Sequence, residues 1–231
     1  MKSTTFKLAA KAMAAAVASV LVQTAQAAIV ITEVDAAGSS AANNADWFEL
    51  TNTGSTAVNI SGWKMDDNSN AFVSAVALRG VTSIAAGQSV VFVEGNSTGS
   101  TDAAINAAFV QAWFGGNAPG NLLIGNYGGS GVGLGTSGDA VNIFTSTGSL
   151  VTRVDLAAST LGRSFDNAAG LNNTTLSTFS TAGVNGARLS ANGIETGSPG
   201  TIAAVPEPES VVLMLTSLGM WGLARARRRQ A

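Results

Sequence analysis

Residues 46–54, DWFELTNTG, join a short apolar segment to a tight turn. Trp47 opens the segment, and Trp63 follows a second turn at Ser61-Gly62. Aromatic residues favour strands, while Asn and Gly adopt the backbone angles that tight turns need. This stretch therefore predicts strands that close over a hydrophobic core.

The same pattern extends outward along the chain as short runs of β-branched and aromatic residues between Gly, Asn and Ser turns. Regular spacing of such runs is typical of a β-sandwich. The predicted fold class is all-β, with strands at residues 29–35, 47–51, 58–60, 63–65, 73–78, 89–94, 122–124, 140–144 and 150–156.

One inserted helix is predicted over residues 102–114. Asp102 is a candidate N-cap, and Ile105, Phe109 and Trp113 recur every fourth residue. That stripe predicts packing against the core. Residues 168–186, rich in Gly, Asn and Thr, predict a long loop with weak strands.

Composition excludes several classes of protein. The 231 residues include no Cys and no His. A disulfide framework is therefore impossible, and the commonest general base and zinc ligand are missing. The Ser and Thr hydroxyls have no His partner, so nucleophilic catalysis has no visible activator.

The first 27 residues have the order of a signal peptide. Three lysines precede the apolar run 12–22, and Ala25 and Ala27 supply small residues for cleavage after Ala27. We expect signal peptidase to remove residues 1–27. The alternative is a buried N-terminal helix.

The last 27 residues have the order of a membrane stop. Val205, Pro206, Glu207 and Pro208 precede an apolar run at residues 211–224, which a basic end at 225–229 follows. Arginines on one side predict a cytoplasmic C-terminus, with the preceding domain outside. As a helix the run spans about 20 Å against a hydrocarbon core of about 30 Å, so it is a poor permanent anchor. The alternative is an amphipathic or core helix. The basic residues are Arg225, Arg227, Arg228 and Arg229.

Residues 205–231 resemble the PEP-CTERM sorting signal, which has a V-P-E-P run, a short apolar helix and a terminal arginine cluster. The resemblance implies processing by an exosortase, a membrane-embedded cysteine transpeptidase. The protein would then be held transiently at the inner membrane and delivered to the cell surface or extracellular matrix.

Residues 28–204 resemble a lamin-tail domain. The resemblance rests on an I-x-E-V opening, the D-W-x-E-L strand, an I-x-G-W strand and a closing S-P-G. It implies an immunoglobulin-like β-sandwich that serves as a non-catalytic interaction or attachment module. The quoted segments are ITEVDAAG (31–38), DWFELTNTG (46–54), AVNISGWKMDD (57–67), IAAGQSVVF (84–92) and GSPG (197–200).

The charge of this middle region limits its partners. Five Lys and Arg stand against twelve Asp and Glu, a net charge of −7 that the basic ends of the chain conceal. An acidic surface repels phosphate backbones, so no nucleic-acid partner is expected. Exopolysaccharide or another envelope protein remains a candidate partner.

Several carboxylates are candidates for chemistry. Glu33 and Glu49 lie in predicted strands and could form an acid/base pair, although strand alternation equally allows both to face solvent. The alternative function is a metal-dependent secreted hydrolase that uses clustered carboxylates such as Asp46, Glu49, Asp66 and Asp67. No catalytic residue is assigned.

Asp66, Asn68 and Asn70 resemble the start of a calcium loop. Ala71 and Ala77 replace the glycine and the bidentate Glu that such a loop needs, which favours a hairpin turn and no cofactor. A weak calcium site remains the alternative.

Residues 133–138, GLGTSG, fit the dinucleotide pattern G-x-G-x-x-G. That pattern requires a following helix, but residues 139–145 alternate as a strand. Turn glycines are therefore predicted.

Overall fold

A computed structural model describes residues 29–36, 45–129, 131–172 and 175–203 of the chain. These residues belong to one unit, Ala27–Val205. The predicted signal peptide, including Ala25 and Ala27, and the predicted sorting tail at 205–231 lie outside the described residues. Within the described ranges, no helix is long and apolar enough to span a bilayer.

The first sheet contains four strands in the order β1-β2-β7-β8. Its first three strands are antiparallel neighbours, whereas β8 runs parallel to β7. A parallel neighbour needs a long crossover, and the inserted helix supplies it between these two strands. The strands are β1 (Ile29–Asp35), β2 (Trp47–Asn52), β7 (Ser89–Glu94) and β8 (Leu123–Tyr127).

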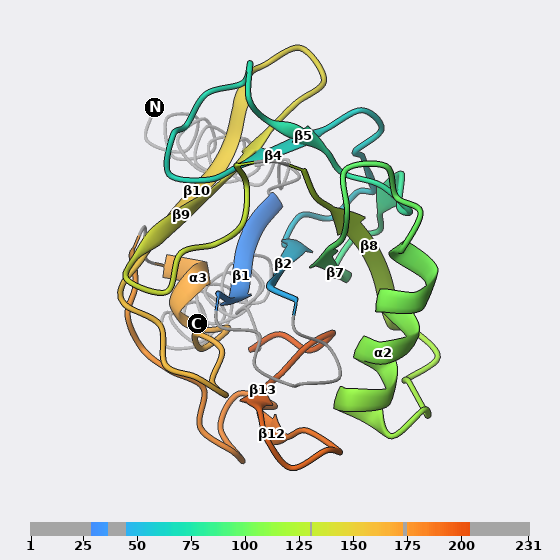
Figure 1. Ribbon diagram of the computed structural model, residues 1–231, viewed down its shortest axis with the longest axis vertical. Helices are drawn as coiled ribbons and strands as arrows, with labels where there is room; N and C mark the ends of the chain where they lie inside the picture. The colour runs from blue at the N-terminus through green and yellow to red at the C-terminus, as the bar shows by residue number, and fades with distance from the viewer. Residues whose placement is uncertain (1–28, 37–44, 130, 173–174, 204–231) are drawn as a thin grey trace, which may run out of the picture. The chain divides into compact units, whose positions relative to one another are not determined.

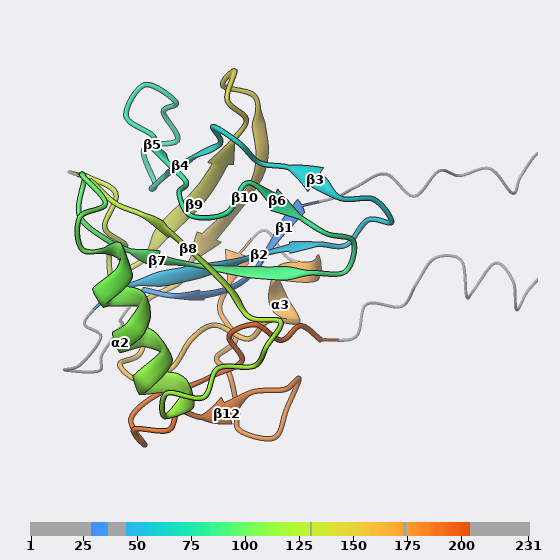
Figure 2. The same ribbon diagram turned by 90° about the vertical axis from the view of Figure 1, so that its right-hand side faces the viewer.

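The second sheet contains five strands in the order β11-β10-β9-β4-β5. It lies on the opposite side of the first sheet from α2 (Asp102–Phe114), as Figure 2 shows. The strands are β4 (Lys64–Asp66), β5 (Val76–Ala77), β9 (Asp139–Phe144), β10 (Leu150–Leu156) and β11 (Thr175–Leu176).

Two short ribbons complete the β structure. They pair β3 (Val58–Asn59) with β6 (Ser83–Ile84), and β12 (Arg188–Leu189) with β13 (Thr196–Gly197). The mostly β architecture agrees with the predicted immunoglobulin-like sandwich.

The main core fills the space between the two sheets. Phe48 and Phe92 stack there, with ring centroids 5.5 Å apart. Trp63 joins the same cluster, as the turn-flanking aromatic residues predicted. Burial of these large apolar side chains stabilises the fold by roughly 1.5–3 kcal/mol each.

Helix α2 covers part of the other face of the first sheet (Figure 1). Phe109 and Trp113 contact Trp47 edge-on, with centroid distances of 5.9 Å and 5.7 Å. Ile105 is partly buried against the same cluster. The predicted bounds of this helix and its packing stripe are confirmed.

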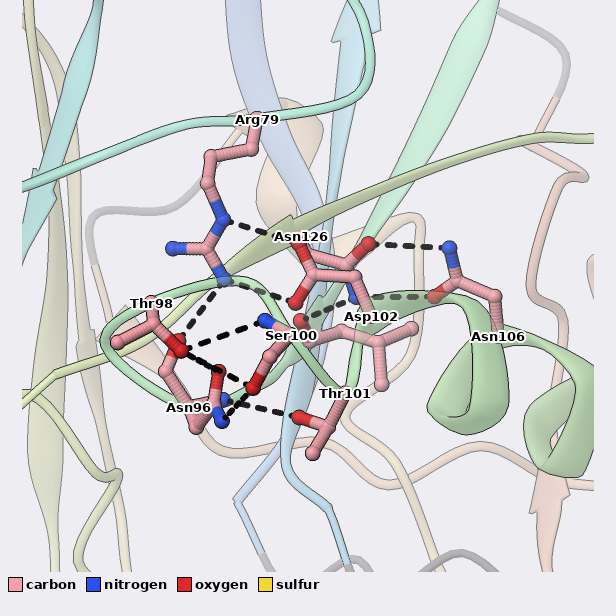
Figure 3. A network of polar contacts seen from close by, with 9 residues as sticks. Arg79, Asn96, Thr98, Ser100, Thr101, Asp102, Asn106 and Asn126 are labelled. Atoms are coloured by element: carbon pink, nitrogen blue, oxygen red, sulfur yellow. Dashed lines mark hydrogen bonds and ion pairs between the residues drawn. The ribbon is translucent and has the colours of Figure 1, made fainter.

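The start of α2 is fixed by an ion pair. Asp102 was expected to be the N-cap, but Thr101 occupies that position and makes no side-chain cap bond. Asp102 instead accepts hydrogen bonds from Arg79 Nε at 3.0 Å and Nη2 at 2.9 Å. Figure 3 shows this pair beside the reciprocal amide bonds between Asn106 and Asn126. These contacts attach the helix to the strand that it precedes.

The structure departs from the sequence prediction in several places: β6, β12 and β13 match no predicted strand, and β8 continues to Tyr127 where 122–124 was predicted. Only Val76–Ala77 forms a strand within 73–78, because Val73 lies in a loop and is 93% exposed. Residues 168–186 contain a one-turn helix α3 (Ala169–Asn172) as well as β11. Two-residue strands and a single helical turn carry too little periodicity to be predicted.

Candidate functional site

Two glutamates lie opposite each other in the first sheet. A β-bulge at Thr32 shifts the register, so that Ile31 pairs with Leu50 but Glu33 pairs with Glu49. The extra residue turns Thr32 and Glu33 to the same face as Glu49. Thr32 Oγ1 donates to Glu49 Oε1 at 2.7 Å, which holds the two strands together on that face.

Glu33 binds the end of the domain. Its Oε1 accepts a hydrogen bond from the backbone N–H of Ser198 at 2.7 Å, and its Oε2 accepts one from Ser198 Oγ at 2.8 Å. Ser164 Oγ donates to Oε1 at 2.5 Å. Ser180 Oγ reaches the same oxygen at 3.5 Å.

Glu49 binds the same segment two residues later. The backbone N–H of Gly200 donates to Glu49 Oε2 at 2.7 Å. Residues 197–200, GSPG, are called the closing segment below. The two carboxylates thus hold a segment more than 150 positions away in the sequence.

The closing segment fits tightly over the pair. Gly197, Ser198 and Pro199 are buried. A Cβ at Gly197 would lie 2.6 Å from Ser164 Oγ, 2.8 Å from Glu33 Oε1 and 2.9 Å from Trp113 Cη2. Only glycine can occupy this position without displacing its neighbours.

Burial dominates the electrostatics of the pair. Both carboxylates are fully buried. Loss of solvation raises the pKa of Glu33 to about 7, against hydrogen bonds from Ser164 and Ser198 that lower it. Loss of solvation, followed by the charge of Glu33, raises the pKa of Glu49 to about 8. The pair therefore carries protons at pH values where an exposed Glu is ionised.

Within the described ranges, no Lys or Arg forms an ion pair with Glu33 or Glu49. Among the described residues, the two ion pairs are Arg79 with Asp102 and Arg153 with Asp155. Arg188 of β12 attracts the charge of Glu33, but its guanidinium lies over the Phe114 ring, 4.6 Å from the ring centroid.

Of the two alternatives that the sequence left open for Glu33 and Glu49, the structure excludes the solvent face. They do form a close pair, but both are buried beneath the closing segment and bonded to it. A general acid or base must reach a substrate within hydrogen-bonding distance. The pair is therefore built to hold the chain, with a shell of hydroxyl groups from Thr32, Ser164, Ser180 and Ser198 that the sequence did not reveal.

The other candidate carboxylates lie in different places. Asp66 ends β4 in the second sheet, and Asp67 caps the N–H of Ser69. Asp46 precedes β2, where its carboxylate accepts the N–H of Leu134 at 3.2 Å. The described part of the chain contains no group of three or more Asp and Glu side chains placed to hold a metal ion.

The candidate calcium loop is a hydrogen-bonded turn. The Asp66 carboxylate accepts from Ser69 Oγ at 2.6 Å, Ala71 N at 2.7 Å and Ser74 Oγ at 3.0 Å. Asn70 has a positive φ of 50°, as an Asx-rich turn allows. Both carboxylate oxygens of Asp66 therefore accept hydrogen bonds from residues of the same loop.

Residues 133–138 form an irregular loop with bends at Gly133 and Gly138 and a turn at Thr136-Ser137, and strand β9 follows it directly. A dinucleotide site would need a helix at this point. The turn interpretation of these glycines is confirmed.

Comparison with protein families places the fold. The model of the family described as Lamin Tail Domain matches residues 22–158, which include β1 to β10 and α2. The closing segment lies beyond the matched residues, although the structure brings it against β1 and β2. A search of curated proteins finds no match. The match covers more than half of the chain, and the chain therefore belongs to the lamin tail domain family.

Proposed function

We propose that this chain is an exported, exosortase-processed protein of the cell surface or extracellular matrix, whose β-sandwich is a non-catalytic interaction or attachment module. A lamin-tail domain of the immunoglobulin type is typically non-catalytic. The proposal joins that property to the two sorting segments of the sequence.

The main observation behind the proposal is that Glu33 and Glu49 form hydrogen bonds to the closing segment of the same chain. These two carboxylates belong to the segments that carry the lamin-tail resemblance, and they bind Ser198 and Gly200. Both carboxylates are fully buried and are bonded to the chain's own backbone, so neither presents an exposed atom to a substrate in this conformation. Their structural role supports an interaction module over an enzyme.

The position of the closing segment also supports the proposal. The fold binds the chain as far as Thr201, whose carbonyl oxygen accepts a hydrogen bond from Asn167 Nδ2 at 2.8 Å, and the V-P-E-P run begins four residues later, at Val205. Two prolines fix φ and remove backbone donors, which keeps such a run out of regular secondary structure. The domain thus ends where the proposed processing segment begins.

The expected ligand is a neutral or cation-bearing polysaccharide, or an envelope protein. Six of the twelve acidic residues of the domain are buried and contribute little to its surface charge, namely Glu33, Asp35, Glu49, Asp66, Asp166 and Glu195. The exposed charge is therefore less negative than the formal value of −7 for residues 28–204.

Intact-mass measurement of protein recovered from the cell surface tests the proposal. We expect loss of residues 1–27 and of the segment that contains Arg225 to Arg229. Replacing both Pro206 and Pro208 with Ala should leave the C-terminus intact, whereas Pro119→Ala, in a loop of the domain, should not. Unprocessed ends in surface material would contradict the proposal.

A pull-down with the host's exopolysaccharide and envelope fraction tests the interaction role. We expect the protein to bind a component of that fraction. Neither Glu94→Gln nor chelation of divalent cations should change this binding. Hydrolysis of a glycoside or phosphodiester by the purified protein would contradict the non-catalytic assignment.

A further inference from the structure

The closing segment is the cover over Glu33 and Glu49. Both carboxylates have no exposed surface, and Ser198 binds one of them through its backbone and its side chain. Gly200 binds the other through its backbone. Detachment of this segment would admit water to both carboxyl groups, so their solvation and the position of the segment are coupled.

The contacts of the pair allow both acids to be neutral while the segment stays bound. Each backbone N–H needs one acceptor oxygen, which is Oε1 of Glu33 for Ser198 and Oε2 of Glu49 for Gly200. The remaining oxygens face hydroxyls, namely Ser198 Oγ and Thr32 Oγ1. A hydroxyl donates to a carboxylate and accepts from a carboxylic acid, so a proton on either oxygen keeps every bond.

Among the described residues, the charged groups that interact with the pair are one cation, Arg188, and one further acid, Asp166. Asp166 repels a charge on Glu33, while Arg188 from β12 attracts it. Arg163 is held elsewhere, because its guanidinium donates to the backbone oxygen of Ser180. Two negative charges on paired residues are therefore poorly compensated.

We propose that Glu33 and Glu49 form a proton-operated latch, which is closed on Ser198 and Gly200 while the pair is protonated and loosens when the pair ionises. The proton leaves from the oxygen that faces a hydroxyl and passes to solvent. No covalent bond changes.

The pKa values give the pH range of the latch. In the closed form they are raised to about 7 and about 8. In the open form water restores values near 4.5, the ordinary value for Glu. The closed form binds more protons between these limits, so it loses stability as the pH rises from about 4.5 through 7 to 8, and the loss levels off above that range.

The latch would regulate the processing that is proposed above, and this consequence rests on that proposed function. With the latch closed, Thr201 is also held, because its carbonyl oxygen accepts a hydrogen bond from Asn167 Nδ2 at 2.8 Å, and three residues separate it from Val205. Release of residues 198–201 from the pair and from Asn167 adds four residues, or roughly 13 Å of extended chain, to this spacer. The V-P-E-P run would then reach further from the domain toward a membrane-embedded enzyme.

Hydrogen–deuterium exchange on the full chain in detergent tests the latch. The backbone amides of Ser198 and Gly200 are followed from about pH 5 to about pH 9, with correction for intrinsic exchange. We expect their protection to fall at least about tenfold per pH unit up to about pH 7, the slope given by loss of one proton or more. Amides of β7 should show no such change.

Matched variants separate charge from packing. The double variant Glu33→Gln, Glu49→Gln keeps an acceptor for each backbone N–H and should make protection independent of pH. Glu94→Gln removes another carboxyl whose pKa burial raises, but on β7, and should leave the wild-type response unchanged. Protection in the wild type that does not vary with pH, or a double variant that follows the wild type, would overturn the latch.

Infrared spectroscopy of the wild type decides the question if the double variant does not fold. A carboxylic-acid C=O band present at about pH 6 and lost by about pH 9 supports the latch, and its absence at pH 6 overturns it.

A cleavage assay in exosortase-containing membranes is a separate arm of the test. Absent cleavage with pH-dependent protection refutes the processing proposal alone. Cleavage with pH-independent protection refutes the latch alone.

Discussion

Replacement of Gly197 by Ala tests how tightly the closing segment is packed. The new Cβ would lie within 3.0 Å of Ser164 Oγ, Glu33 Oε1 and the Trp113 ring. Such overpacking costs about 1–3 kcal/mol. Displacement of the segment would also weaken the Ser198 hydrogen bond, which contributes roughly 1 kcal/mol. We therefore expect the free energy of unfolding to fall by about 2–4 kcal/mol.

Urea unfolding of the full chain in detergent, followed by Trp fluorescence, measures this loss. Gly120→Ala is the matched control, because a Cβ at Gly120 would meet no atom within 4 Å. The control should be neutral or stabilising by up to about 1 kcal/mol. A Gly197→Ala variant within about 0.5 kcal/mol of this control would refute the packing argument, since unexceptional surface changes have effects of that size.

Three further predictions concern the helix and the turn. Phe109→Ala should lower the free energy of unfolding by about 3–5 kcal/mol in the same urea assay, because Phe109 is fully buried beneath α2. Arg79→Ala should lower it by about 1 kcal/mol and speed hydrogen exchange in the first turn of α2, because the partly exposed pair with Asp102 is lost; unchanged exchange there would count against an anchoring role. Millimolar calcium should leave the melting temperature unchanged, since Asp66 already accepts three hydrogen bonds; a rise on calcium addition that Asp66→Ala abolishes would show that this loop binds the ion.

Much of the sandwich could be predicted from the sequence because its long strands are locally distinctive. Strands β1, β7 and β10 have the predicted bounds, and so does α2. In each case the pattern of apolar residues and the flanking turn residues agree with the tertiary structure. Local preference and final environment point to the same conformation here.

The environment of Glu33 and Glu49 could not be predicted in the same way. A polar residue in an alternating strand ordinarily marks the solvent face. In β2 all six residues are buried, because α2 and the closing segment cover the face that alternation assigns to water. Only contacts between distant parts of the chain show this, and a two-residue strand such as β13 gives no local pattern to reveal them.

The closing segment also determines how the domain bears mechanical load. A pull on the C-terminal side of the chain reaches Thr201, which Asn167 holds, and then Gly200 and Ser198, which are anchored to β2 and β1. The force passes to the first hairpin of the fold before it can peel β13 from β12. Two anchors on neighbouring strands share the tension. In a domain that is tethered by its C-terminal side, β1 and β2, the first two strands of the sequence, therefore bear the applied force.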